Sequence, residues 1–386
     1  MTASVYTTQY LGVAFIFAAA VVVLREAGVG LDKLALIHLI GLPIAGKIFY
    51  APFIDRYRLP FQGQYRSWLL LAQGLMTIIL FIVGLLDFHT QLLPIFAILM
   101  GYTFIVALQD VAIDGLVCKI FDKSQRKYAN SLQFSSNLLG NIIGGGVLLI
   151  TYPYLGWQGS LWVLAGLTAI SWLQLVFYNE PEQTTVPLTF KRLFGDCKHF
   201  IMHNKRWFVW LVIYPLGSVG AFTVLTPMLV DAGWDKSSIG FAVKIYGSII
   251  GVCSALSAAL IIKKIGRYRC LRYLTFALAI SPILMLLTAL GITHKLYVYV
   301  VITAYFIVFP AVLATFATLM MDKASAYPQC RATLFTLQFS LQSLLSFVYA
   351  GLFMALAKFV GYEFVIVLGI VCTFFCAIVS PWYLRE

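Results

Sequence analysis

Two carboxylates, Asp110 and Asp114, lie four residues apart inside an apolar run that extends from about Leu93 to Cys118. The run is long enough to cross a bilayer as a helix, and the spacing puts both side chains on one helix face. An ionised carboxylate near the middle of a membrane costs about 3 kcal/mol, and two like charges one turn apart also repel each other. Such a pair is tolerated where it faces water, a counter-ion or a proton. The pattern therefore indicates a polar site inside a membrane transporter.

The candidate partner of these carboxylates is Lys47, which lies near the middle of a predicted helix over 34–53. Its four-carbon stem is too short to reach the interface easily from there. Lys47 is either a counter-ion to Asp110 or a ligand for an anionic substrate, or it alternates between the two roles. In a dry cavity Asp110 could bind and release a proton near neutral pH. Asp114 either shares this proton-coupling role or pairs with one of the nearby arginines, at positions 56, 58 and 66.

Further polar residues lie inside other predicted helices, and each has two interpretations. They either contact the substrate or form interhelical hydrogen bonds worth about 0.6–2 kcal/mol. The candidates are Gln133, Asn137, Gln338 and Lys244. The glycines at 140 and 144 have a small-xxx-small spacing, which favours close helix packing over phosphate binding.

The composition determines the class of protein. Of the 386 residues, 61% are hydrophobic and only 11% are charged, whereas a soluble domain has about 25% charged residues. The sequence predicts an all-α polytopic membrane protein with twelve spans in two six-helix halves, 1–178 and 207–386, joined by a cytoplasmic linker over 179–206. The expected spans are 8–24, 34–53, 67–86, 93–118, 132–152, 159–178, 207–230, 237–262, 272–292, 296–321, 333–356 and 361–383.

Orientation and internal symmetry support this division. If the N-terminus is cytoplasmic, 20 of the 27 Lys and Arg residues fall in inside segments, as the positive-inside rule requires. The net charge of +12 then reflects topology and gives no reason to expect a nucleic-acid partner. Leu-Gln-Phe-Ser occurs at 132–135 and again at 337–340. Together with two similar matches, this repeat indicates a parallel duplication of six helices.

Two motifs carry a family resemblance. Residues 46–57, Gly-Lys-Ile-Phe-Tyr-Ala-Pro-Phe-Ile-Asp-Arg-Tyr, resemble the helix 2 signature of AmpG-type muropeptide permeases. Gln109, with Asp110 and Asp114 after it, resembles the helix 4 signature of the same group. The resemblance implies the major facilitator fold and a polar site that includes Gln109. It also implies that Asp55, Arg56 and Arg66, in and beside the loop between helices 2 and 3, belong to the facilitator gating motif.

Finer details resemble the RhtX/FptX-type siderophore permeases, a sister branch of the same group. These details are Asn-Ser-Leu-Gln at 130–133 and three glycines at 144–146 before Gly-Trp-Gln at 156–158. The chain departs from the muropeptide group at Tyr50, where that group usually has Trp. It also has Asn137 and Asn141 where Arg and Gly are expected.

We therefore expect a proton-coupled importer in a bacterial inner membrane, with both termini in the cytoplasm. A siderophore, iron-loaded or as the free organic acid, is the first choice of substrate, and an anhydromuropeptide is the alternative. We expect a monomer in the lipid bilayer, with no cofactor and no metal site. A membrane enzyme such as an acyltransferase is disfavoured, because the chain has no catalytic constellation, Walker A motif or nucleophile elbow.

Overall fold

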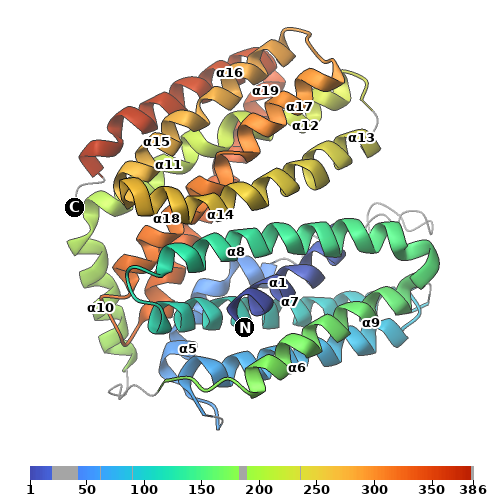
Figure 1. The fold of residues 1–386 in the computed structure, drawn as a ribbon, viewed down its shortest axis with the longest axis vertical. Coiled ribbons are helices and arrows are strands. Elements are labelled where there is room, and N and C mark those ends of the chain that lie inside the picture. Colours follow the sequence, from blue (N-terminus) through green and yellow to red (C-terminus); the bar gives the residue numbers. More distant parts are fainter. Residues whose placement is uncertain (20–41, 61, 89, 182–188, 235, 384–386) are drawn as a thin grey trace. The chain divides into compact units, whose positions relative to one another are not determined.

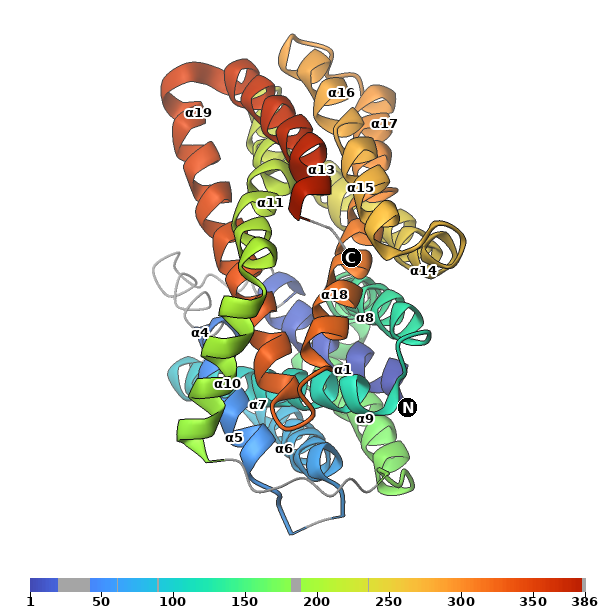
Figure 2. The ribbon, with the colours of Figure 1, turned by 90° about the vertical axis from the view of Figure 1, so that its left-hand side faces the viewer.

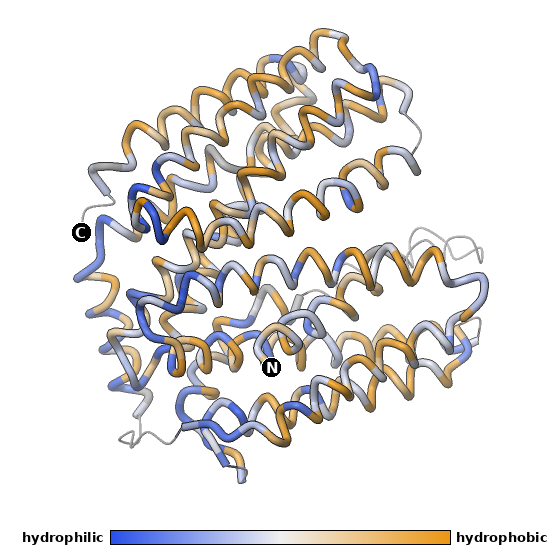
Figure 3. Tube along the Cα trace, in the orientation of Figure 1, coloured by the Kyte–Doolittle hydropathy of each residue, from blue (hydrophilic) through white to orange (hydrophobic). Residues whose placement is uncertain are grey.

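The computed structural model describes the chain apart from residues 20–41, 61, 89, 182–188, 235 and 384–386. Within the described part every regular element is a helix, and no strand occurs. The prediction of an all-α protein is confirmed (Figure 1). Figure 3 shows hydrophobic residues along the long helices and hydrophilic residues gathered mainly near helix ends and connecting segments.

The N-terminal half of the sequence contains ten described helical elements, several of which follow one another within a single transmembrane passage. They are α1 (Thr2–Ala14), η1 (Phe15–Ala19), α4 (Leu42–Ala45), η2 (Lys47–Phe49), α5 (Ala51–Arg56), α6 (Gln64–Leu85), α7 (Leu92–Ile120), α8 (Arg126–Gly140), η3 (Asn141–Val147) and α9 (Leu148–Val176). The elements η1 and η3 are π-helical and η2 is a 3₁₀ turn.

The second half begins with a helix in the predicted linker and continues to the C-terminus. Its described elements are α10 (Phe190–His203), α11 (Lys205–Thr223), α12 (Leu225–Asp231), α13 (Lys236–Gly240), η4 (Phe241–Tyr246), α14 (Gly247–Ile265), α15 (Arg267–Leu278), α16 (Ile280–Ala289), α17 (Lys295–Phe306), α18 (Phe309–Ala324) and α19 (Arg331–Tyr383). The element η4 is π-helical.

Nine helical segments of the described chain are long and apolar enough to cross a membrane. One of them, Arg126–Val176, is 51 residues long and bends at Gly156, whose φ is 63°. At 1.5 Å per residue, a straight helix of that length is more than twice as long as the hydrocarbon core is thick. The bend therefore divides it into two passages. Gly361, with φ of 81°, divides α19 in the same way.

The chain folds as two compact units. Each unit contains most of one half of the sequence and a short segment of the other half. The first unit comprises 1–129, 136–194 and 321–337, and the second comprises 130–135, 195–320 and 338–386. The core of the first unit lies among α1, α6, α7 and α9, and α6 runs beside α9 (Figure 1). The core of the second unit is built mainly from α12, η4, α16, α17 and α19.

The structure corrects the expected course of the helix over 34–53. Residues 34–41 lie outside the described part, and from Leu42 onward the helix is broken. Gly46 leads into the 3₁₀ turn η2, and α5 begins at Ala51 with Pro52 in its first turn. Proline has no N–H to continue a helix but is tolerated where a new helix begins. Lys47 therefore stands on a tight turn and not on a regular helix.

Two other boundaries also differ from expectation. The first helix begins at Thr2, six residues before the predicted start, and Val5 and Tyr6 in its first turns are buried inside the first unit. The predicted linker contains α10, a 14-residue helix. A search for apolar runs misses the early start of α1 and misses α10, because both helical segments contain polar residues.

Candidate transport site

Lys47 and Asp110 form a buried ion pair in the first unit. The Lys47 ammonium donates to Asp110 Oδ2 at 2.5 Å, and each side chain is 8% exposed. The 3₁₀ turn η2 presents Lys47, and the middle of α7 presents Asp110. Two opposite charges so placed cancel within the membrane, where either one alone would be costly. The contact is the one expected from the counter-ion interpretation of Lys47.

The helix α1 supplies the remaining contacts to this face of α7. Gln9 Nε2 donates to Asp110 Oδ1, and the Tyr6 hydroxyl donates to Asp114 Oδ1 at 2.9 Å. Gln109 Nε2 donates to the Val5 carbonyl at 2.9 Å. Tyr6, Gln9 and Gln109 are all buried. The α1 residues thus hold both carboxylates of α7 by side-chain donors, while Gln109 anchors the two helices to each other.

Tyr6 and Gln9 were missed in the sequence analysis. They lie three residues apart on one face of α1. Tyr6 precedes the expected span, and Gln9 lies inside it but was not selected as a polar candidate. Asp114 was expected either to couple protons or to pair with a loop arginine, and the partner observed on α1 is the Tyr6 hydroxyl. The polar residues along one face of the first helix were the signal in the sequence that this helix could contact the two carboxylates.

The end of α8 and the π-helical segment η3 pack closely on α1. A Cβ atom at Gly140 would lie 2.5 Å from the Cβ of Tyr10, and one at Gly144 would overlap the backbone of Leu11. The close-packing interpretation of these glycines therefore agrees with the structure. Asn137, one turn before Gly140, accepts a hydrogen bond from Asn141 Nδ2 at 3.0 Å.

The structure places the other three predicted substrate residues in the second unit. Gln338 is fully buried; it donates to the Met320 carbonyl at 3.1 Å and accepts from Trp207 Nε1 at 2.7 Å. These contacts join α19 to α18 and α11, so they agree with the interpretation of Gln338 as an interhelical hydrogen-bonding residue. Gln133 is buried near the start of α8, and Lys244 is exposed on the π-helical segment η4. π-Helical insertions often occur at functional positions.

The predicted gating residue Asp55, near the end of α5, contacts the beginning of α19, whose first residues belong to the first unit. Its carboxylate accepts hydrogen bonds from the Tyr65 hydroxyl at 2.7 Å and from the backbone N–H of Ala332 at 3.4 Å. It also accepts from the N–H and the hydroxyl of Thr333, each at 2.7 Å. A carboxylate at a helix N-terminus accepts hydrogen bonds from the free N–H groups there, and the positive end of the helix dipole stabilises its negative charge.

The two predicted gating arginines have different surroundings. Arg66 Nε donates to the Leu175 carbonyl at 3.0 Å and Arg66 Nη2 to the Val176 carbonyl at 2.7 Å, so this side chain caps the end of α9. The Arg56 guanidinium lies 5.1 Å from the centre of the Tyr57 ring, within the range of a cation–π contact.

Glu180 is a buried carboxylate that the sequence analysis did not select. Its Oε2 accepts from the backbone N–H groups of Tyr65 and Arg66, at 2.9 and 2.7 Å, and its Oε1 pairs with Lys119 at 2.5 Å. It therefore joins the start of α6 to the end of α7. Gly63 makes room for it, since a Cβ there would lie 2.6 Å from Glu180 Oε2.

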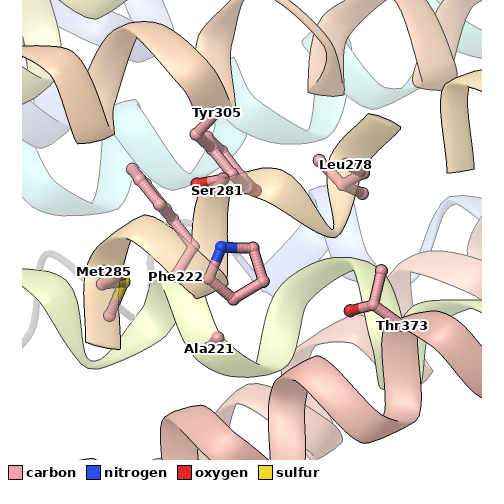
Figure 4. A pocket seen from close by; sticks show the side chains of 8 residues that line it. Ala221, Phe222, Leu278, Ser281, Met285, Tyr305 and Thr373 are labelled. Atoms are coloured by element: carbon pink, nitrogen blue, oxygen red, sulfur yellow. The ribbon is translucent and has the colours of Figure 1, made fainter. Parts of the chain in front are cut away.

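A small pocket lies inside the second unit, lined by Ala221, Phe222, Leu278, Ser281, Pro282, Met285, Tyr305 and Thr373. Figure 4 shows these side chains converging from several helices, with three hydroxyl-bearing residues among mostly apolar neighbours. The cavity of about 10 Å³ has room for about one water molecule. It is too small for an organic solute.

Among the described residues, no group of three or more His, Cys, Asp or Glu side chains is arranged to hold a metal ion.

A protein-family model described as Major Facilitator Superfamily matches residues 2–350. The chain belongs to the Major Facilitator Superfamily. Members of this superfamily are membrane transporters, which is the class expected from the sequence, and the described part of the chain has the apolar spans of a multi-pass membrane protein.

Curated relatives of this facilitator include AmpG-type permeases, as the motif resemblance predicted. The chain is 27% identical to the anhydromuropeptide permease of Escherichia coli over 249 residues, which cover 63% of this chain and 51% of that protein. It is 22% identical to a transporter named AmpG 4 from Rickettsia felis over 268 residues, which cover 66% of this chain and 65% of that protein. The chain thus spans about half the length of the E. coli permease that it matches.

Solved transporters share the fold at low sequence identity. FucP, a facilitator crystallised in its outward conformation, superposes with a TM-score of 0.73 at 11% identity, covering 100% of this chain and 98% of that one. The human organic anion transporter MFSD10 gives a TM-score of 0.72 at 12% identity, with the same coverage. These similarities confirm the major facilitator fold.

Proposed function

We propose that this facilitator imports an organic anion together with protons, and that the ion pair between Lys47 and Asp110 is its coupling site. The observation that carries the proposal is the burial of this pair in the first unit, where Asp110 also accepts a hydrogen bond from Gln9. Packing alone does not require a buried ion pair, because two apolar side chains of equal volume are often as stable.

Charge balance suggests how the site works. When Asp110 takes up a proton, its negative charge disappears and the positive charge of Lys47 remains. A carboxylate of the substrate then restores neutrality by binding Lys47. Loss of the proton from Asp110 reforms the ion pair and displaces the substrate. One proton and one carboxylate therefore enter together, and neither the loaded nor the empty site holds a net charge in the membrane.

Other residues have supporting roles in this scheme. Asp114, one turn along α7 and bonded to Tyr6, is the proposed next proton acceptor on the same helix face. Five further residues are proposed substrate contacts: Gln109, Asn137, Lys244, Gln133 and Gln338. Asp55, Arg56 and Arg66 are proposed to control opening of the gate, with the contacts of Asp55 to α19 closing it.

An anhydromuropeptide is the first candidate for the substrate, since the E. coli relative is named for that activity and such molecules carry carboxylates. A siderophore is the second candidate, favoured by the likeness of residues 130–133 and 144–146 to siderophore permeases and by Tyr50. The proposed location is the bacterial inner membrane, with a monomer whose termini are both cytoplasmic.

Uptake into proteoliposomes with an imposed pH gradient tests the proposal. Labelled anhydromuropeptide and a ferric siderophore, with separate labels on the iron and the ligand, would be supplied in parallel. We expect concentrative uptake of one of them by the wild-type protein and by Asp122→Asn, a control in an exposed loop, but not by Asp110→Asn. Full pH-dependent uptake by Asp110→Asn would contradict the coupling role, and uptake that ignores the pH gradient would contradict proton coupling.

A further inference from the structure

The helix α10 lies between two membrane-spanning helices. The preceding passage ends with α9 at Val176, and α11 begins at Lys205, two residues after α10 ends at His203. Figure 2 shows α10 leading into α11. Only Asn204 separates α10 from this helix, which is long and apolar enough to enter a membrane, so we infer that α10 lies near the membrane surface.

One side of α10 is packed against the protein and the adjoining side is not. Leu193 and Phe200, seven residues apart, are buried. Phe194 and Ile201 follow them by one residue each and are 68% and 38% exposed. A spacing of seven residues keeps two side chains on one helix face. The helix therefore presents an apolar edge that no described part of the protein covers.

Lysines border this apolar edge. Lys191 and Lys198, again seven residues apart, are exposed, and the helical rotation places them next to Phe194 on the side away from Leu193. Lys205 and Arg206 add two exposed cations at the start of α11. An exposed apolar edge flanked by lysines is the pattern of a helix that lies in a membrane interface and attracts anionic lipids.

We propose that α10 binds the head groups of anionic phospholipids. Phe194 and Ile201 insert at the boundary between head groups and acyl chains, and Lys191 and Lys198 extend along this edge to the lipid phosphates. The partner follows from charge complementarity and from the position of the helix beside the bilayer that its neighbouring helices span. The inference is independent of the substrate and of proton coupling.

Hydrogen–deuterium exchange on the full chain in nanodiscs tests this proposal. Residues 190–203 are compared in phosphatidylcholine alone and in phosphatidylcholine with phosphatidylglycerol. We expect slower amide exchange in the anionic nanodiscs. The variant Lys191→Gln/Lys198→Gln should lose most of that difference, because each lysine near an anionic surface contributes about fivefold.

A matched control removes two other exposed lysines near a helix end, in Lys263→Gln/Lys264→Gln at the end of α14. This control should keep the wild-type dependence on phosphatidylglycerol. Equal exchange in the two lipids, or an equal loss in both variants, would overturn the proposal. Protection that rises with protein concentration and ignores lipid composition would assign the surface to a second copy of the chain and also overturn it.

Discussion

Asp55 and Thr333 are 278 positions apart in the sequence, yet Asp55 Oδ2 accepts both the backbone N–H and the hydroxyl of Thr333 at 2.7 Å. Thr333 is the third residue of α19, so the carboxylate sits where a helix has free N–H groups and a partial positive charge. The side chain of Asp55 thus caps the N-terminus of α19 from a distant part of the sequence.

Asp55→Ala should loosen the start of α19. The change removes charge-assisted hydrogen bonds, each worth about 1.5–3 kcal/mol when made to a charged group. Cys330, which is fully buried just before α19, is a native reporter of this region. We expect faster alkylation of Cys330 in the variant, measured by mass spectrometry of the labelled peptide.

Asp122→Ala is the matched control for that measurement. Asp122 is also an acidic loop residue, and its hydrogen bonds with Ser124 lower its pKa below the ordinary value, so it is ionised at neutral pH. The hydrogen bonds of its carboxylate go to Ser124 and Gln125 in its own turn. Alkylation of Cys330 in this variant should match the wild type. If Asp55→Ala also matched it, the capping role of Asp55 would be wrong.

The pair of Lys47 and Asp110 predicts a non-additive pattern of stability. Asp110→Asn leaves the Lys47 charge in the membrane without its counter-charge, and Lys47→Met does the converse. Each single change should lower the free energy of unfolding by about 3–5 kcal/mol. The double variant carries neither charge and should be more stable than either single variant, while remaining inactive in transport. Thermal unfolding in detergent gives the comparison.

Lys244→Gln provides the control for this cycle, since Lys244 is exposed and its loss should change the unfolding midpoint little. Additive losses in the double variant would show that the two charges do not stabilise each other. In that case the ion pair in the structure would contribute nothing to the fold.

Much of the polar site could be predicted from the sequence. A charged residue inside an apolar run is rare enough to stand out, and Lys47 and Asp110 were each recognisable for that reason. Their pairing was one of two open interpretations, because a sequence does not show which helices are neighbours. The break at Gly46 that turns Lys47 toward α7 involves a backbone turn, which an apolar run does not predict.

Residues that act through ordinary polar groups escaped detection. Tyr6 and Gln9 lie in a helix whose start looks like a polar terminus, and their importance follows only from the packing of α1 on α7. Glu180 lies in a segment that looks like a solvated linker. It is buried because the start of α6 offers free N–H groups and Lys119 offers a charge. These partners are distant in sequence, so their positions required the fold.

Glu180→Ala should destabilise the first unit. The change leaves Lys119, whose side chain is 7% exposed, without a carboxylate and also uncaps the start of α6. We expect a loss of about 3 kcal/mol in the free energy of unfolding. Glu363→Ala, at an exposed acidic residue of α19, is the control and should have little effect. Equal midpoints for the two variants would contradict the structural role of Glu180.

Gly144→Ala tests the contact between η3 and α1. A Cβ atom at this position would overlap the carbonyl oxygen of Leu11, and backbone atoms cannot move aside as a flexible side chain can. We expect a loss of about 1–3 kcal/mol in the free energy of unfolding, as for other overpacked sites. Gly101→Ala is the matched control, because nothing lies within 4 Å of a Cβ at Gly101 in α7. There alanine should raise the stability by up to about 1 kcal/mol, since it favours a helix over glycine. The two variants should therefore shift the unfolding midpoint in opposite directions, and a shift in the same direction would mean that α1 and η3 are not packed through Gly144.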